Sequence, residues 1–326
     1  MCSQGLFDRY INFYTDFAFK KLFGTEMNKD LLISFLNALL HGREEIVDVT
    51  YMNAEHLGTQ EYDRRAVFDV YCKNDRGEMF IVEMQKGEQQ FFKDRSIYYS
   101  TFAIREQAPR GIWNYELKGV YTIAILNFCL PDMERSQDFY HEIKLMDIAT
   151  KSVFYDKLTF IYLEMPKFTK TEQELVTLFD KWLYAIRNLA SLMERPRMLQ
   201  DKVFERLFET AEIAKYDRKE RYEYEESLKN YRDWFSVMET AEIRGLEKGM
   251  KEGMEKGMEK GMEKGMEKGM EKGRAEGRAE GRAEGRAEGR AEGRAEIALA
   301  MLAKGMDVSA ISELTGLSAD EIQTLR

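Results

Sequence analysis

The sequence has few of the residues that build disulfide or zinc frameworks. Its 326 residues include three cysteines and three histidines. Cys2, Cys72 and Cys129 are odd in number and far apart, which argues against a disulfide framework. No apolar run approaches the ~20 residues of a membrane helix, and the N-terminal residues are too charged for a signal peptide. These absences predict a reduced, zinc-free, cytoplasmic protein with no membrane segment.

The net charge of −9 does not by itself exclude a nucleic-acid partner. Binding to phosphates depends on where the basic side chains gather, and the acids here are spread along the chain. An apolar content of 44% is enough to bury a substantial core, and the length allows about two domains.

The most informative segment is a predicted β-hairpin with acids on both strands. Asp75 to Gly77 lies between two runs of β-branched and aromatic residues, and Gly77 can supply the positive φ that closes a three-residue loop. This loop pairs Asn74 with Glu78. Counting outward from that pair places Asp69 opposite Glu83.

Two acids in that arrangement repel each other unless a cation neutralises them. Cβ atoms of directly opposite residues lie roughly 4.5–5.5 Å apart, so like charges there destabilise the sheet. A Mg²⁺ ion prefers such oxygen ligands and would neutralise Asp69 and Glu83 together. In the alternative, one acid turns to solvent and pairs with Lys73 or Arg76. Both interpretations remain open on the hairpin alone.

Strand alternation assigns the neighbouring side chains to faces of the sheet. Glu83 and Gln85 project from one face, together with Ile81, and Lys86 points to the other. Gln85 is therefore placed to act beside Glu83, whereas Lys86 is not.

At these residues the chain resembles the PD-(D/E)XK nuclease superfamily. Asp69 and the later Glu83-Met84-Gln85 match its core pattern, with Gln85 in the position of the usual lysine. More narrowly, the chain is similar to the Rpn group of recombination-promoting nucleases, which are also described as transposases. The resemblance covers about residues 10–245, and its supporting segments are Asp16 to Gly24, Leu32 to Leu40, Asp94 to Phe102 and Leu163 to Phe168.

This resemblance implies metal-dependent cleavage of DNA. Asp69, Glu83 and the backbone carbonyl of Met84 would coordinate Mg²⁺, and the metal would activate water for attack on phosphorus. Asp16 would help to complete the site. Gln85 would orient the water by hydrogen bonding, since an amide cannot supply the positive charge of lysine.

Basic side chains around the proposed site are the expected DNA contacts, chiefly Lys20, Lys86 and Arg95. Contacts to phosphates fix position without reading sequence, so the predicted endonuclease has low sequence specificity. Arg95 fits equally well on the solvated face of a helix that covers the sheet. The rival function is a non-catalytic DNA-binding or assembly protein in which Gln85 marks a decayed site.

The chain divides into four predicted segments. Residues 1–168 form the α/β nuclease core, a restriction-endonuclease-like fold with a mixed sheet flanked by helices. Residues 169–244 change to a period of 3.6 and form a helical region. The glycine tetrapeptide repeat, MEKG and then RAEG, fills 245–296, and 297–326 form a small helical tail.

In the repeat, glycine occurs at every fourth residue from Gly245 to Gly293. Each glycine costs a helix about 1 kcal/mol relative to alanine, so the total penalty is on the order of 12 kcal/mol. The segment is therefore either a flexible tether or a weak helix through which chains self-associate as a homo-oligomer.

The tail resembles a helix-turn-helix. Gly305 ends one helix, Ser309 is the expected N-cap of the next, and Ser318 with Glu321 forms a capping box for the last. The last helix is short and carries one base, Arg326, so a role as a helical cap or assembly element is favoured over DNA reading.

Overall fold

The computed structural model describes residues 8–43, 45–53, 55–56, 66–109, 111–131 and 136–325. Two compact units divide the chain, Met1–Met238 and Glu239–Arg326. The candidate catalytic residues all belong to the first unit.

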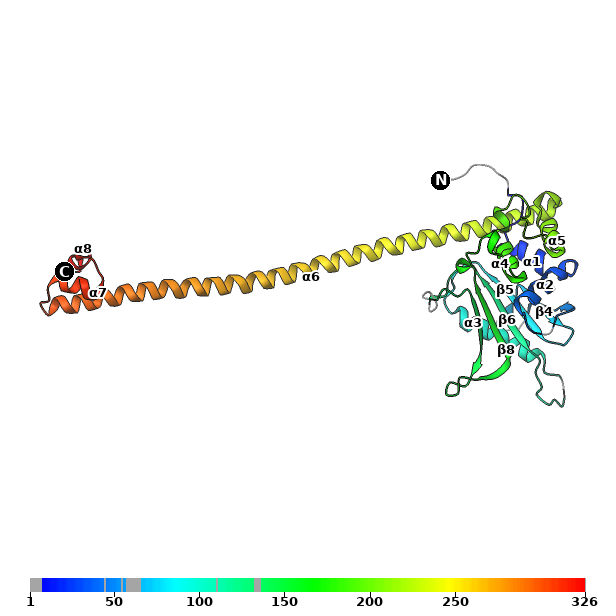
Figure 1. The fold of residues 1–326 in the computed structure, drawn as a ribbon, viewed down its shortest axis with the longest axis horizontal. Helices are drawn as coiled ribbons and strands as arrows, with labels where there is room; N and C mark the ends of the chain where they lie inside the picture. The colour runs from blue at the N-terminus through cyan, green and yellow to red at the C-terminus, as the bar shows by residue number, and fades with distance from the viewer. Residues whose placement is uncertain are drawn as a thin grey trace. The chain divides into compact units, whose positions relative to one another are not determined.

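The first unit is built on a six-stranded mixed sheet, which confirms the predicted fold class (Figure 1). The strand order is β1-β4-β5-β6-β8-β7. Strands β5, β6 and β8 are parallel to one another, and β1, β4 and β7 pair antiparallel to their neighbours. The strands are β1 (Val49–Tyr51), β4 (Val70–Asn74), β5 (Met79–Gln85), β6 (Val120–Leu126), β7 (Tyr140–Met146) and β8 (Val153–Glu164), with β2 (Glu55–His56) and β3 (Ala66–Val67) forming a separate pair.

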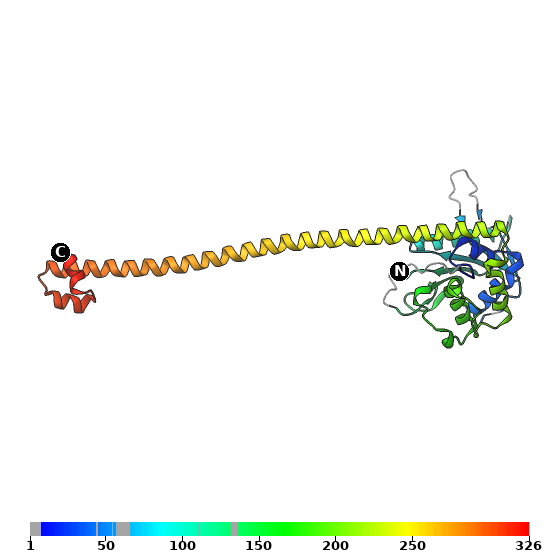
Figure 2. The same cartoon turned by 90° about the horizontal axis from the view of Figure 1, so that it is seen from above.

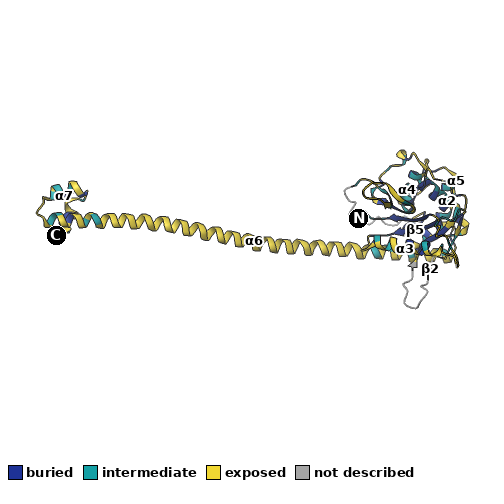
Figure 3. Cartoon of the chain, turned by 90° about the horizontal axis from the view of Figure 1, so that it is seen from below, coloured by how far each residue is buried: buried dark blue, intermediate teal, exposed yellow. Residues whose placement is uncertain are grey.

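Helices cover both faces of this sheet. Phe80 and Val82 of β5 join the larger core with the helices of one face, and Met79 and Ile81 pack with Phe102 of α3 on the other. The central strands β5 and β6 are buried along their whole length (Figure 3). The larger core contains residues from α1 (Asp16–Phe23), α2 (Lys29–Leu39), α4 (Leu178–Asn188) and α5 (Lys202–Ala211); α3 is Phe92–Glu106, and the short 3-10 turns are η1 (Glu26–Asn28), η3 (Met165–Lys167), η4 (Glu172–Glu174), η5 (Leu189–Ser191) and η6 (Ile213–Lys215).

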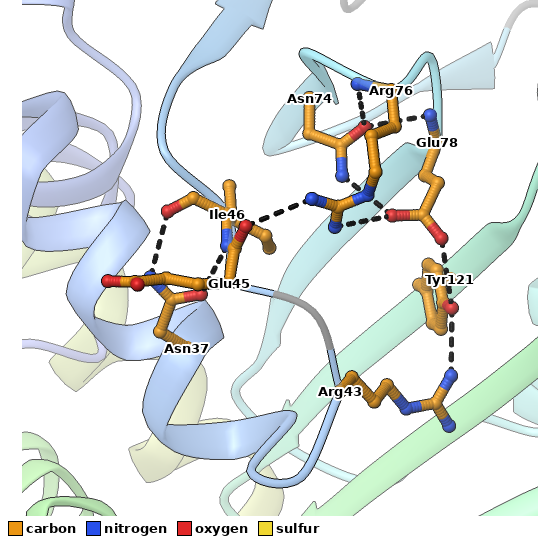
Figure 4. A network of polar contacts seen from close by, with 8 residues as sticks. All are labelled: Asn37, Arg43, Glu45, Ile46, Asn74, Arg76, Glu78 and Tyr121. Atoms are coloured by element: carbon orange, nitrogen blue, oxygen red, sulfur yellow. Dashed lines mark hydrogen bonds and ion pairs between the residues drawn. The ribbon is translucent and has the colours of Figure 1, made fainter.

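The hairpin between β4 and β5 has the register that its turn predicts. Lys73 pairs with Met79 and Val70 with Val82, and Gly77 has a φ of 78°. The Asn74 side chain accepts the backbone N–H of Glu78 at 2.9 Å, which holds the turn closed. Figure 4 shows this turn within a polar network in which Arg76 also reaches the Glu45 carbonyl.

The glycine repeat is helical in the structure. Helix α6 extends from Arg218 to Ala303, and the boundary between the two units falls within it. The repeat is an unbroken helical ribbon in Figure 2. Glycine still contributes its N–H and C=O to the helical ladder, and the other repeat residues are good helix formers. The repeat is thus helical in the structure, and self-association through it stays a prediction.

The tail forms a small core of its own from Ala298, Ile311 and Ile322, and Gly305, with a φ of 77°, lies just beyond the end of α6. Helix α7 is Val308–Thr315 and α8 is Ala319–Thr324. The expected cap at Ser309 was wrong. Asp307 is the N-cap, because its carboxylate reaches the Ser309 N–H at 3.2 Å and satisfies a free amide of the first turn.

The capping box of Ser318 and Glu321 is confirmed. Arg326, on which the DNA-reading interpretation of the tail depended, lies outside the described residues.

Candidate active site

Asp69 and Glu83 lie at the open end of the hairpin, where the β4–β5 pairing stops. Asp69 directly precedes Val70, the first residue of β4. Its carboxylate accepts the backbone N–H of Met84 at 2.9 Å. The side chain thereby replaces the backbone acceptor that a longer β4 would offer to β5.

Glu83 is buried, with 6% of its surface exposed, and its two carboxylate oxygens have different surroundings. Oε2 accepts Gln85 Nε2 at 3.0 Å and Arg95 Nη2 at 3.3 Å. Oε1 accepts no hydrogen bond from the described part of the chain. Gln85 therefore lies on the predicted face beside Glu83, and it leaves one oxygen of this carboxylate available.

A small hollow of about 10 Å³ adjoins Glu83 between β5, β6 and α3. It is lined by Glu83, Arg95, Tyr99 and Thr122, among others. The Thr122 hydroxyl, like Glu83 Oε1, is buried without a hydrogen-bond partner among the described residues. A space of this size has room for about one water molecule.

The protein disfavours two ionised carboxylates here. Burial raises the pKa of Glu83 to about 8, and the charge of Asp69 adds to the effect while Arg95 opposes it. Burial also raises the pKa of Asp69, and the hydrogen bond from Met84 acts in the opposite direction. A cation bound between the two groups would oppose both shifts, because a nearby positive charge favours the ionised form of a carboxyl group.

The carbonyl of Met84 is directed toward the same region. Gln85 turns its carbonyl toward β6, where it accepts the Asn127 N–H at 2.9 Å. Successive residues of a strand direct their polar backbone groups to opposite sides, so Met84 directs its N–H and C=O away from β6, toward Asp69. Asp69, Glu83 and this carbonyl form a compact set of oxygen donors.

Asp16 and the nearby bases lie along the adjoining helix α1. Asp16 is its first residue and forms an ion pair with Lys86 Nζ at 3.0 Å. Lys86 therefore extends to the α1 side, away from Glu83. Lys20 is exposed one turn further along, and the charges of Asp16 and Lys20 both act on the Asp69 carboxyl.

Arg95 of α3 points inward to the candidate site. Besides Glu83 it contacts the Gln89 side chain, and its guanidinium lies over the Tyr99 ring at 5.3 Å from the centroid. In the structure, Arg95 therefore has the Glu83 carboxylate as a partner within the site.

Within the described ranges, no group of three or more aspartate, glutamate, histidine or cysteine side chains is arranged to hold a metal. The candidate ligands at the hairpin end are the Asp69 and Glu83 carboxylates and the Met84 carbonyl, of which Glu83 lines the hollow. This set fits Mg²⁺, which prefers hard oxygen ligands, keeps several waters and binds through one or two carboxylates. The unpartnered Glu83 Oε1 is the atom best placed to reach such an ion.

The sequence reasoning missed Thr122 and Asn127. Thr122 interrupts the otherwise apolar and aromatic run of β6, and its polarity within a fully buried strand was an available signal. Asn127 gave no such signal, because its bond to Gln85 depends on the pairing of β5 with β6.

A mixed sheet with an acid before one hairpin strand and Glu-x-Gln at the end of the next is the arrangement expected of a PD-(D/E)XK nuclease. Residues 13–241 match the family model described as PD-(D/E)XK nuclease family transposase. The chain belongs to this family, within the Rpn group. Members of the superfamily generally use divalent cations.

Residues 291–326 match a second model, the C-terminal helix-turn-helix domain of the Rpn/YhgA-like nuclease family. Comparisons with curated proteins and with solved structures gave no match. No helix in the described part of the chain combines the length and apolar character that crossing a bilayer requires.

Proposed function

We propose that this protein is a Mg²⁺-dependent DNA endonuclease of low sequence specificity that acts in recombination or on mobile elements. The observation that carries the proposal is the buried Glu83 Oε1, which has no hydrogen-bond partner among the described residues, in a side chain that lines a small hollow and feels the charge of Asp69. A buried carboxylate oxygen without a partner is costly unless it serves a ligand.

Each residue of the site has a role in this proposal. Asp69, Glu83 and the Met84 carbonyl hold the metal, which when bound supplies an activated water and stabilises charge on the phosphate. Gln85 is a positioning residue, because its amide fixes Glu83 Oε2 and leaves Oε1 free. Asp16, whose charge acts on the Asp69 carboxyl, acts in this proposal through a metal-bound water.

Basic side chains beside the site bind the DNA backbone. Lys20 is exposed on α1 without a carboxylate partner among the described residues, so it is free to meet a phosphate. Arg95 has N–H groups beyond those used by Glu83 and Gln89, and a guanidinium binds phosphate well. Lys86 contributes positive charge on the α1 side next to Asp16.

Low sequence specificity follows from the kind of contacts available, since contacts to phosphates carry no base information. The family of the C-terminal domain supports a second DNA contact by α7 and α8. In this proposal the core, residues 1–168, cuts the DNA, and the helical region 169–244 completes the fold of the core. The repeat 245–296 links the core to the tail, and the tail 297–326 binds DNA.

The proposal is tested by incubating the full-length protein with supercoiled plasmid in Mg²⁺ or in EDTA. Nicked circles formed only with the metal support it. Plasmid binding without nicking under any divalent cation would instead support the rival function, a DNA-binding protein in which Gln85 marks a decayed site.

A further inference from the structure

A second hollow, of about 360 Å³, opens at the same edge of the sheet as Glu83 and Gln85. Its walls come from the segment before α1, the residues after β6 and β8, the end of α4 and the first-unit part of α6. The residues that matter for its chemistry are Asn12, Tyr14, Asn127, Arg187 and Tyr231. The volume is within the ~300–1,000 Å³ typical of small-ligand pockets.

This pocket lies at the same end of β5 and β6 as the candidate active site, on the face of the sheet opposite the Glu83 side chain. Asn127, in its wall, donates its backbone N–H to the Gln85 carbonyl at 2.9 Å. Tyr14, in another wall, is two residues before Asp16. The pocket also lies beyond the carboxyl ends of the parallel strands β6 and β8, which is where ligands bind in open α/β sheets.

The chemistry of the pocket favours an anion. Arg187 is exposed in the wall, and it forms no ion pair within the described part of the chain. No acidic residue lines the pocket. An unpaired guanidinium without a neighbouring carboxylate is suited to a phosphate group, which it can bind through two parallel hydrogen bonds.

The pocket also offers groups that suit a planar base. The Tyr231 ring is partly exposed there, and its hydroxyl accepts the Asn127 amide at 3.4 Å, which fixes both side chains. Bases stack on aromatic rings with little dependence on sequence. A phosphate site and a ring surface in one pocket together match a nucleotide.

A larger and more basic hollow, of about 470 Å³, lies at the opposite ends of β6 and β8 but has fewer free groups. Its bases are already engaged: Arg43 and Lys144 share Glu142, Arg76 pairs with Glu78, and Lys118 pairs with Glu116. Figure 4 shows that Arg43 and Arg76 belong to the network around the hairpin turn. These cations hold the fold together, so we assign no ligand to that hollow.

We propose that the pocket at Arg187 and Tyr231 takes one unpaired nucleotide of the DNA substrate, at the end of the sheet where the candidate active site also lies. The Arg187 guanidinium binds the phosphate of that nucleotide, and its base lies against the Tyr231 ring. This inference rests on the proposed function and names its substrate class: DNA that contains unpaired nucleotides, such as a bubble, a junction or a single-stranded end.

The test compares the binding of two fluorescent DNAs to the full-length protein in EDTA, so that no cleavage is needed. One DNA is fully paired, and the other has the same length with a central bubble of unpaired thymines. We expect the bubble to bind about tenfold more tightly, given the strength of base stacking on aromatic side chains. Arg187→Gln should remove this difference and change binding of the paired DNA little.

Matched variants separate the pocket from general effects. Arg197 is exposed and carries no ion pair among the described residues, so Arg197→Gln should preserve the preference for the bubble. Tyr231→Phe keeps the ring and should also preserve it, whereas Tyr231→Ala should remove it. Thermal unfolding of each variant verifies that the core is intact.

Equal affinity of the wild type for the two DNAs would overturn the inference. A bubble preference that survives both Arg187→Gln and Tyr231→Ala, or an equal loss of both affinities in those variants, would also overturn it. Because binding is measured without metal, a protein that prefers the bubble but never cuts would contradict the nuclease function and leave the nucleotide pocket supported.

Discussion

The acidic pair at the hairpin end should make the metal-free protein less stable as the pH rises. Glu83 is the residue to change, because burial and the charge of Asp69 raise its pKa to about 8. Glu83→Gln keeps the size of the side chain and an oxygen that accepts a hydrogen bond, but removes the ionisation. We expect this variant to be more stable than the wild type at neutral and alkaline pH without metal.

The sign and size follow from the difference between the folded and unfolded chains. The unfolded chain ionises this carboxyl near the ordinary pKa of 4.5, whereas the folded protein retains the proton to about pH 8. Stability is therefore lost as the pH rises from 4.5 to 8, where the unfolded state binds fewer protons. At 1.36 kcal/mol per pH unit, the loss is roughly 3 kcal/mol at pH 7 and roughly 5 kcal/mol above pH 8.

Urea unfolding followed by tryptophan fluorescence measures the stability of the first unit, which contains Glu83. Trp113, Trp182 and Trp234 all lie in the first unit, Met1–Met238. Wild type and Glu83→Gln are compared in EDTA at pH 5, 7 and 8.5, with Glu88→Gln, at an exposed position, as the control. The advantage of Glu83→Gln should be small at pH 5 and grow with pH.

Addition of Mg²⁺ should then reverse the order of stability. The ion neutralises the pair in the wild type and stabilises only the state that binds it. Glu83→Gln should gain little. An advantage that does not change with pH, or a variant that is less stable than the wild type at pH 8.5 without metal, would refute this description of the site.

Three further predictions address the site and the repeat. Asp69→Asn should abolish plasmid nicking while the metal-free stability stays equal or rises, because asparagine still accepts the Met84 N–H; undiminished nicking would contradict the assignment. Gln85→Ala should lower the nicking rate by ~10–100-fold and Gln85→Lys should leave it equal or higher, whereas a neutral Gln85→Ala would place Gln85 outside the site. Deleting whole tetrapeptides between Gly249 and Gly293 should leave the single-cut activity of the core nearly unchanged. Sedimentation of the same deletion series decides the role of the repeat. An unchanged oligomer mass across the series indicates a link between core and tail, and stepwise dissociation indicates self-association.

The hairpin was predictable because its determinants are local. The Asn74 to Gly77 turn fixes the register, and the register fixes the faces, so the positions of Asp69, Glu83, Gln85 and Lys86 all follow from counting residues. The observed pairing of Lys73 with Met79 confirms the count. The family resemblance supplied the chemistry that counting could not.

Features that depend on contacts between distant segments were not predictable. Arg95 is twelve residues from Glu83, and only the packing of α3 on the sheet brings them together. The pocket at Arg187 requires α4, the residues after β6 and α6 to meet, and nothing in their local sequence indicates it.

Local signals could also mislead where two of them competed. Asp307 and Ser309 are both residue types that cap helix N-termini well. Asp307 is the N-cap because α7 begins at the next residue, Val308. In the repeat, the cost of the glycines argued against a helix. The residues between the glycines favour a helix, however, and α6 includes the whole segment.

The most direct test of the central claim is the initial rate of plasmid nicking as Mg²⁺ is raised from zero, measured for wild type and Asp69→Asn side by side. The proposed site predicts no nicking without metal, a rate that saturates with Mg²⁺ in the wild type, and no metal-dependent rate in the variant. A wild-type rate that is independent of Mg²⁺, or an equal response in Asp69→Asn, would contradict it.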